Sequence, residues 1–377
     1  MADAKQEVDT KGWNYIPERF DTFGNWMEQQ KIPIIKGFFA DINKVELEYW
    51  DLKGGPGAFV VLDGTGGVND GYVCEIPPGG KLKPQKHLYE EMVYITKGNG
   101  STTVWQRDGR KHSFEWGTGS LFAIPLNARY QHFNGSGTEP ARYFSVTNAV
   151  FMMNLFHNQD FIFDNDFAFL DRFNPAKDDY FSGEGEILGR FFMSTNFIPD
   201  TIGIKLMDYS ERGKGSTNMK FDLAGNTMCA HISEFPVGTY KKGHKHGPGA
   251  HVIILSGEGY SVLWPEMEED NKRRVDWYPG CVVVPPNQWF HQHFNGGATR
   301  ARYLALRWNS WRYKFFKLND EGSTYTSIKK GGAQIEFEDE DPRIHRDFET
   351  QMKKAGAQCQ MGDYHPFCTY KHATASS

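Results

Sequence analysis

The sequence contains one long pattern twice, and this repeat limits the possible folds more than any other feature. Residues 77–105 match residues 235–264, and residues 115–136 match residues 276–297. Within each matched block the glycines and tryptophans keep a constant offset, so insertions fall between the blocks. A repeat of about 160 residues is too long for a solenoid, whose units are roughly 20 to 50 residues. We therefore expect two copies of one domain.

Composition and local pattern indicate that each copy is a β domain. Glycine accounts for 40 of the 377 residues and aromatic residues for 15 %; the usual share of glycine is about 7 %. Short runs such as MVYIT, HVIIL and CVVVPP are bounded by glycine and proline, which is typical of strands. The predicted fold class is all-β, with two β-barrels or jelly rolls in one chain.

The repeat divides the chain into two barrels with other segments around them. A short helix is predicted near residues 19–30 and a longer one over residues 342–356, where Pro342 follows an acidic run. The predicted organisation is an N-terminal arm (1–50), an N-terminal barrel (51–150), an inter-domain crossover (151–209), a C-terminal barrel (210–315) and a C-terminal extension (316–377).

Charge, hydropathy and cysteine content argue against several classes of protein. The 42 Lys and Arg against 47 Asp and Glu give a net charge of −5, so we expect no nucleic-acid partner. No apolar run of about 18 residues and no apolar leader occur, so we expect a cytoplasmic protein without a membrane partner. The five cysteines are widely spaced and lack a CxxC pair, so we expect neither a disulfide framework nor a thiolate zinc site.

The histidines gather in the second copy of the repeat. Six of the 13 lie between His231 and His293. His244 and His246 are separated by one residue, so on a strand their imidazoles share a face. His291, from the second matched block, would complete a three-histidine metal site, because imidazole suits Fe, Zn, Cu and Ni.

The matched blocks resemble the two sequence motifs of the cupin superfamily, so the chain resembles a bicupin. In the second copy Gly238 is followed by five residues and then by the His244–His246 pair, and Gly280 is followed at family spacing by His291. The resemblance implies two double-stranded β-helix (jelly-roll) domains with short helical flanks. It also implies a metal held by three histidines and often one glutamate.

The two copies differ at the positions of these ligands. In the second copy Ala250 takes the place of the glutamate, and His251 stays open as a fourth ligand if a bulge shifts the strand. The first copy lacks two of the three histidines, so a weak second metal and a polar core cluster are both open there. Its four ligand positions hold Gln85, His87, Glu91 and Tyr130.

The three-histidine set resembles that of gentisate-type ring-cleaving dioxygenases. This implies a non-haem metal-dependent dioxygenase that uses O2 to cleave a C–C bond of a small, oxygenated, aromatic substrate. Fe(II) is the implied cofactor, and Mn(II), Ni(II) and Cu(II) stay open. The alternatives are a metal-dependent decarboxylase or isomerase, and a bicupin that binds a metal or ligand without catalysis. The flanking arms and many aromatic residues indicate a homo-oligomer.

Two further residues are candidates for catalysis. His293 lies two residues from His291 and is a candidate acid–base group, although His132 occupies its place in the first copy, which favours a structural role. Arg307 lies on a predicted strand after the second block, where a guanidinium could bind a substrate carboxylate through two hydrogen bonds. Arg302 has a counterpart in Arg142, which indicates a structural role for both.

Overall fold

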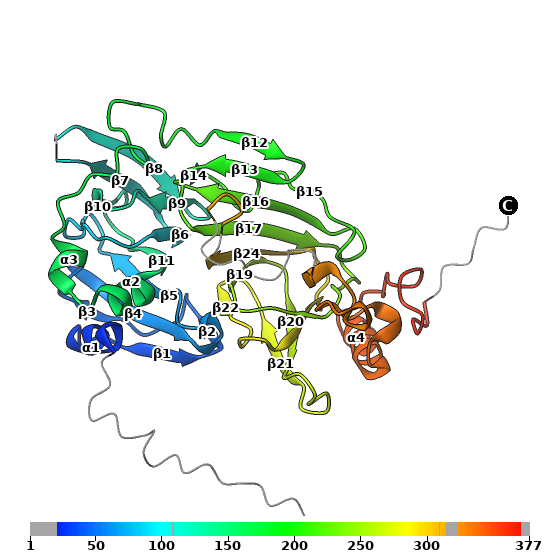
Figure 1. Cartoon of the computed structure of the whole chain (residues 1–377). Helices are drawn as coiled ribbons and strands as arrows, with labels where there is room; N and C mark the ends of the chain where they lie inside the picture. Colours follow the sequence, from blue (N-terminus) through cyan, green and yellow to red (C-terminus); the bar gives the residue numbers. More distant parts are fainter. Residues whose placement is uncertain (1–20, 108, 309, 314–322, 371–377) are drawn as a thin grey trace, which may run out of the picture.

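Two barrels with the same strand order lie side by side in the computed structural model, which describes residues 21–107, 109–308, 310–313 and 323–370 (Figure 1). The fold is all-β, with two jelly-roll barrels and short helical flanks. The four α-helices of the described residues are α1 (Thr22–Gln29), α2 (Ala149–Phe156), α3 (Gln159–Phe163) and α4 (Pro342–Lys354). Four short 3-10 helices are η1 (Asp63–Thr65), η2 (Ser323–Tyr325), η3 (Ile328–Lys330) and η4 (Phe337–Asp339).

The N-terminal barrel consists of a large sheet in the order β1-β4-β5-β11-β6-β9-β14, with β3 beside β4, and a small sheet in the order β10-β7-β8. Its strands are β1 (Ile34–Gly37), β3 (Glu48–Trp50), β4 (Gly55–Leu62), β5 (Asp70–Ile76), β6 (Glu91–Lys97), β7 (Asn99–Trp105), β8 (Lys111–Gly117), β9 (Leu121–Ile124), β10 (Arg129–Asn134), β11 (Ala141–Thr147) and β14 (Phe197–Ile198).

The C-terminal barrel repeats this arrangement in the order β12-β13-β16-β17-β24-β19-β22-β2, with β15 beside β16, and a small sheet β18-β23-β20-β21. Its strands are β2 (Phe39–Asp41), β12 (Gly185–Gly189), β13 (Phe192–Thr195), β15 (Met207–Asp208), β16 (Thr217–Leu223), β17 (Met228–Phe235), β18 (His244–Lys245), β19 (His251–Ser256), β20 (Gly259–Trp264), β21 (Arg273–Trp277), β22 (Cys281–Val283), β23 (Phe290–Asn295) and β24 (Ala301–Trp308).

Glycines that recur in the two sequence copies mark matching tight turns. Gly98 and Gly257 follow β6 and β19 with φ of 89° and 78°. Gly119 and Gly280 precede β9 and β22 with φ of 90° and 93°. Residues other than glycine rarely adopt this left-handed backbone conformation, which accounts for the recurrence of these four glycines.

The two barrels exchange a strand. In the N-terminal arm, β1 pairs with β4 of the first barrel, whereas β2 pairs with β22 of the second barrel. Before the second barrel, β13 pairs with β16 of that barrel, whereas β14 pairs with β9 of the first. We predicted both segments outside the barrels, as the N-terminal arm and the crossover. In the structure each segment instead contributes strands to both large sheets. The boundaries of the two domains stay a prediction.

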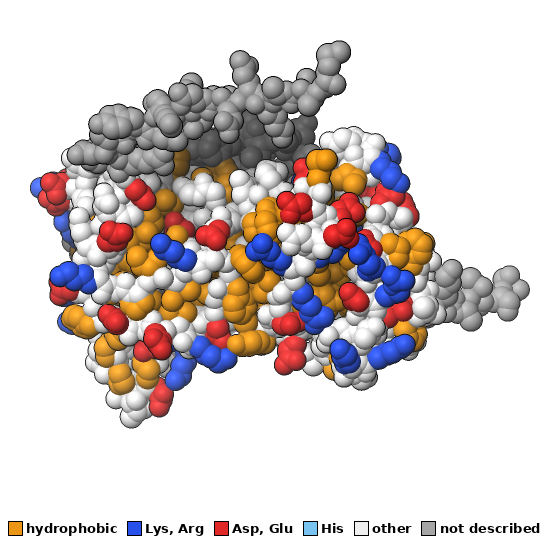
Figure 2. Space-filling view, turned by 90° about the horizontal axis from the view of Figure 1, so that it is seen from below, with side chains coloured by type: hydrophobic (Ala, Val, Ile, Leu, Met, Phe, Trp, Pro, Cys, Tyr) orange, Lys and Arg blue, Asp and Glu red, His pale blue; other side chains and the backbone are white. Residues whose placement is uncertain are grey.

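The large sheets pack face to face between the barrels. One apolar cluster joins outward side chains from both sheets, including Val60, Met92 and Phe144 of the first barrel and Phe221 and Leu304 of the second. Two aligned sheets in contact bury a layer of this kind from water. On the face shown in Figure 2, acidic and basic side chains are interspersed, in keeping with the balanced composition. None of the helices in the described part of the chain is both long and apolar enough to span a membrane.

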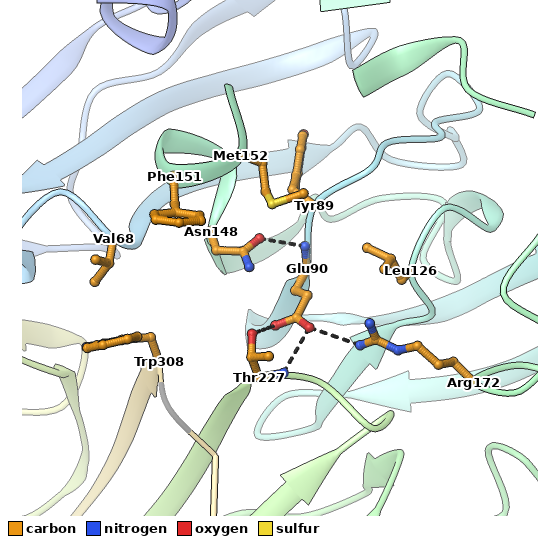
Figure 3. Close-up of a pocket in the computed structure, with 10 residues that line it drawn as sticks. All are labelled: Val68, Tyr89, Glu90, Leu126, Asn148, Phe151, Met152, Arg172, Thr227 and Trp308. Carbon is orange, nitrogen blue, oxygen red and sulfur yellow. Dashed lines mark hydrogen bonds and ion pairs between the residues drawn. The ribbon is translucent and has the colours of Figure 1, made fainter. Parts of the chain in front are cut away.

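A buried carboxylate strengthens the contact between the barrels (Figure 3). Glu90, only 4 % exposed, accepts hydrogen bonds from the backbone N–H groups of Thr227 and Met228 at 2.8 and 2.9 Å. It also accepts one from the Thr227 hydroxyl at 2.7 Å and forms an ion pair with Arg172 at 3.0 Å. These groups lie beside a cavity that is lined mainly by apolar side chains such as Trp308.

Replacing Glu90 by alanine is expected to lower the free energy of unfolding by about 3 kcal/mol, because buried donors and the Arg172 guanidinium lose their acceptor. Urea denaturation, followed by far-ultraviolet circular dichroism, measures this difference. Glu115→Ala, at an exposed position on β8, is the matched control and should unfold like the wild type. Equal midpoints for Glu90→Ala and the control would contradict the role of Glu90.

Candidate metal centre

Three histidines converge on the inner side of the small sheet in the C-terminal barrel. His244 on β18 lies directly opposite His291 on β23, and His246 follows two residues after His244. The ring centroids of His244 and His291 are 4.3 Å apart, and those of His246 and His291 are 4.8 Å apart. One ring nitrogen from each histidine lies within 4.8 Å of the others. The structure thus brings together all three residues that the sequence proposed as metal ligands.

Backbone hydrogen bonds orient two of these imidazoles. Nδ1 of His244 lies 3.2 Å from the carbonyl oxygen of Lys242, and Nδ1 of His291 lies 3.2 Å from that of Trp289. A carbonyl oxygen only accepts, so Nδ1 carries the proton in both rings and Nε2 keeps its lone pair. This is the arrangement in which metal-binding histidines are usually held.

The three histidines are neutral in this environment. Burial lowers the pKa of His291 to about 4. Burial, and after it the positive charge of Arg212 and the other histidines, holds the pKa of His244 well below its usual value. The pKa of His246 is also well below its usual value, first because of burial and then because of His291 and Arg307. Neutral imidazoles are the form that binds metal ions. The charge and the orientation of these side chains therefore both fit a metal.

His251, left open by the sequence as a fourth ligand, lies on the other side of its strand. Its Nδ1 is 3.1 Å from the side-chain amide of Asn69, and its ring centroid is 5.9 Å from that of Phe144. Both partners belong to the first barrel, so His251 is part of the contact between the barrels. No bulge brings it toward His244, and the buried Ala250 occupies the position where the family motif has glutamate.

His293 lies near the three histidines but has a structural partner. Its Nδ1 is 2.8 Å from the Ser261 hydroxyl, which also accepts a hydrogen bond from the indole N–H of Trp277. The same hydrogen-bond chain recurs in the first barrel, where the places of His293, Ser261 and Trp277 are taken by His132, Thr102 and Trp116. This hydrogen-bond chain occurs both in the barrel that has three histidines and in the barrel that lacks them, which indicates a structural role. The ring of His293 is 5.7 Å from that of His291.

Arg307 projects toward the interior of the C-terminal barrel. It alternates along β24 with Leu306 and Trp308, which face the other barrel, and it shares its side of the strand with Tyr303. Its guanidinium lies 5.3 Å from the ring centroid of Trp311 and lowers the pKa of His246. Arg302, in contrast, forms an ion pair with Glu234 at 2.9 Å and is structural, as its repetition predicted.

Further basic residues surround the three histidines, and the sequence analysis did not single them out. Lys241 donates to the Tyr303 hydroxyl at 3.0 Å, and Arg212 donates to Gln334 at 2.6 Å. After burial, the charged groups that most affect the pKa of His231 and His293 are all basic groups or histidines. Lys241 lies three residues before His244 in the sequence, and this closeness was a signal that could have identified it. Arg212 lies outside the matched blocks and had no such signal.

The corresponding place in the N-terminal barrel is filled by a hydrogen-bonded cluster. Glu91 lies 2.9 Å from Nε2 of His87 and accepts from the hydroxyls of Tyr130 and Ser145 at 2.7 Å and from that of Tyr72. The ammonium group of Lys53, 2 % exposed, donates to the two tyrosine hydroxyls. Gln85, predicted at a ligand position, turns away and donates to the carbonyl oxygen of Leu52 at 2.9 Å. The geometry favours the polar core cluster over a second metal.

Among the comparisons with known proteins, one family model matches part of the first barrel. A family model described as "Cupin domain" matches residues 72–147, within the N-terminal barrel. No curated protein matches the sequence. Among solved structures, a Lactobacillus farciminis oxalate decarboxylase in complex with formate is similar at 13 % identity, with a TM-score of 0.48 over 72 % of this chain and 86 % of the other. A variant of the Bacillus subtilis oxalate decarboxylase is similar at 14 % identity, with a TM-score of 0.47 over 73 % and 78 %.

Proposed function

We propose that the C-terminal barrel is the active site of a metal-dependent enzyme, in which His244, His246 and His291 hold one divalent metal ion. The observation that carries this proposal is the convergence of three neutral imidazoles, two of them with Nε2 fixed as the free nitrogen. Three neutral ligands leave coordination positions for other molecules. Fe(II) is the metal proposed first, and Mn(II), Ni(II) and Cu(II) are accepted by the same ligands.

The charge around the three histidines supports an anionic substrate. Arg212, Lys241 and Arg307 lie on the same side of the barrel, and the groups that act on the histidines are basic. Arg307 presents a planar guanidinium, which can bind a carboxylate through two hydrogen bonds. We therefore propose a small carboxylate substrate. The aromatic side chain of Trp311 beside Arg307 favours an oxygenated aromatic acid.

The reaction we propose is the cleavage of a C–C bond of this acid by O2. Fe(II) bound at the three histidines would supply electrons and open positions for O2 and substrate. The chain itself would orient the carboxylate through Arg307 and keep bulk water away through the buried walls of the barrel. A decarboxylase or isomerase needs a proton carrier, and the candidate that the sequence offered, His293, is held by its hydrogen bond with Ser261 at 2.8 Å. We therefore propose the oxygenase first.

The experiment is an oxygen-uptake screen on protein purified without oxygen and loaded with Fe(II). Hydroxylated aromatic acids are compared with the corresponding uncharged alcohols. The proposal expects O2 consumption with at least one acid, and none with the matched alcohol. Release of CO2 or isomerisation without O2 consumption would instead select the alternative reaction class. An acid that binds to the Fe(II)-loaded protein without any turnover would select a binding protein.

Arg307→Ala is expected to raise KM for the acid found in this screen about 100-fold, because a charged, two-point contact contributes roughly 3 kcal/mol. Metal content should stay at the wild-type level, since Arg307 is no ligand. Arg300→Ala, which removes an exposed arginine paired with Glu234, is the matched control and should leave KM unchanged. An unchanged KM in Arg307→Ala would remove Arg307 from substrate binding.

A further inference from the structure

A second group of metal-binding side chains lies in the C-terminal extension, away from the three histidines. His345 and Glu349 lie one turn apart on α4, and Cys359 and Cys368 follow in the loop after the helix. All four side chains are buried, and one ligand atom from each lies within 4.8 Å of all the others. The sequence predicted no thiolate zinc site, because the two cysteines are nine residues apart and have no CxxC spacing.

The distances within this group suit a tetrahedral zinc ion. With Zn–S bonds of about 2.3 Å and Zn–N and Zn–O bonds of about 2.0 Å, a tetrahedron has S···S and N···O edges of roughly 3.8 and 3.3 Å. The Sγ atoms of Cys359 and Cys368 are 3.6 Å apart, and His345 Nε2 lies 3.3 Å from Glu349 Oε1. The third distance, between Cys359 Sγ and His345 Nε2, is 4.0 Å, longer than the S···N edge of roughly 3.5 Å that the same bond lengths give.

A hydrogen-bond chain holds His345 in the ligand tautomer. The Tyr240 hydroxyl lies 2.7 Å from Glu340 and 2.8 Å from Nδ1 of His345. Because a carboxylate only accepts, the hydroxyl donates to Glu340 and its oxygen accepts from Nδ1–H. Nε2 of His345 therefore carries a lone pair and faces the carboxylate of Glu349. Such carboxylate-linked chains commonly orient histidines that bind zinc.

Two acceptors that face each other at 3.3 Å are reconciled by a proton or by a metal ion between them, and only a metal ion would also bind the two cysteines. Glu349 is already fixed by the backbone N–H and the hydroxyl of Thr369, at 2.7 and 2.8 Å, so its oxygen cannot turn away without losing these bonds. A disulfide does not resolve the arrangement, because its S–S bond is about 2.05 Å and leaves the histidine and the carboxylate unpaired. A zinc ion would satisfy all four groups at once.

We propose that His345, Glu349, Cys359 and Cys368 bind a structural zinc ion. Two thiolates, one imidazole and one carboxylate make a closed four-ligand set, which is characteristic of structural sites, whereas the barrel site has three ligands and open positions. The extension packs Phe348 and Met352 against Phe294 on the outer side of β23. The same strand carries His291 on its inner side. The zinc ion would therefore stabilise the C-terminal extension, which packs on the outer side of this strand.

Cobalt substitution in the full chain tests this proposal. The protein is stripped with a chelator, reduced, and titrated with Co²⁺. Thiolate ligands give a ligand-to-metal charge-transfer band in the near ultraviolet, whereas three imidazoles give none, so the barrel site does not contribute. We expect this band in the wild type and in His291→Ala. It should be lost in Cys359→Ser and Cys368→Ser, and retained in Cys281→Ser, which alters an equally buried cysteine outside the group.

A second measurement covers variants that do not fold. In the wild type, bound zinc should protect Cys359 and Cys368 from alkylation, and chelation should expose both, as read by peptide mass spectrometry. The proposal is overturned if reduced, folded wild-type protein gives no thiolate-to-Co²⁺ band, or if protein purified without reductant contains a Cys359–Cys368 disulfide in place of zinc.

Discussion

His291→Ala is expected to lower the metal affinity of the C-terminal barrel by more than about 100-fold and to abolish O2 consumption. Loss of a residue that only orients a ligand already costs about 10- to 100-fold in affinity, and His291 is itself a proposed ligand. Metal analysis by plasma mass spectrometry on protein purified without oxygen measures the first effect, and oxygen uptake measures the second.

The control for this variant is His157→Ala, which removes an exposed histidine at the end of α2. Because zinc in the extension would add to the total metal, iron is counted separately. Iron that stays at the wild-type level in His291→Ala would place the metal elsewhere, and the assignments of His244 and His246 would then fail with that of His291.

The second large effect concerns stability. Glu91→Gln is expected to lower the free energy of unfolding by about 3 to 5 kcal/mol, because it leaves the buried ammonium group of Lys53 without a counter-charge. Thermal or urea unfolding measures this loss. The double variant Lys53→Met with Glu91→Gln should recover much of it, since the uncompensated charge is gone. A double variant as unstable as Glu91→Gln alone would show that the hydrogen bonds of Glu91, and not its charge, are decisive.

Acid should weaken the same cluster. Burial alone would raise the pKa of Glu91, but Lys53, His87 and Tyr72 more than offset this, so the pKa lies well below its usual value. A carboxyl group with a lowered folded-state pKa contributes stability that is fully present above the unfolded-state pKa of about 4.3 and is lost as the pH falls below it. The stability difference between wild type and Glu91→Gln should therefore shrink below about pH 4.

The sequence predicted the parts of the site that depend on local pattern. The repeat implied two equal barrels, and the His244–His246 spacing implied a shared strand face, because both follow from periodicity along the chain. The register that sets His291 opposite His244 is a pairing between distant segments. Periodicity does not predict such a pairing, and the repeat and the resemblance to known motifs were the signals for it. His251 faces away because the register of its strand shifts only after Ile254, too late to turn His251 toward His244.

Other features carried no local signal. Lys53 precedes the first matched block, yet its ammonium group donates to two buried tyrosine hydroxyls in the interior of the first barrel. Cys359 and Cys368 approach each other only because the loop after α4 folds back onto the helix. The two-residue strand β14 and the three-residue strand β2 are too short to stand out from their surroundings, and their partners lie in distant parts of the chain.

The exchange of β2 and β14 has a consequence for the ancestry and the dissection of this molecule. If two identical barrels on separate chains traded these strands, they would form a swapped homodimer; joining their genes end to end would give the present topology. Neither half is then a module that can be cut out. A fragment that begins after residue 41 would expose β22 as an open edge, ready to recruit a strand from another molecule.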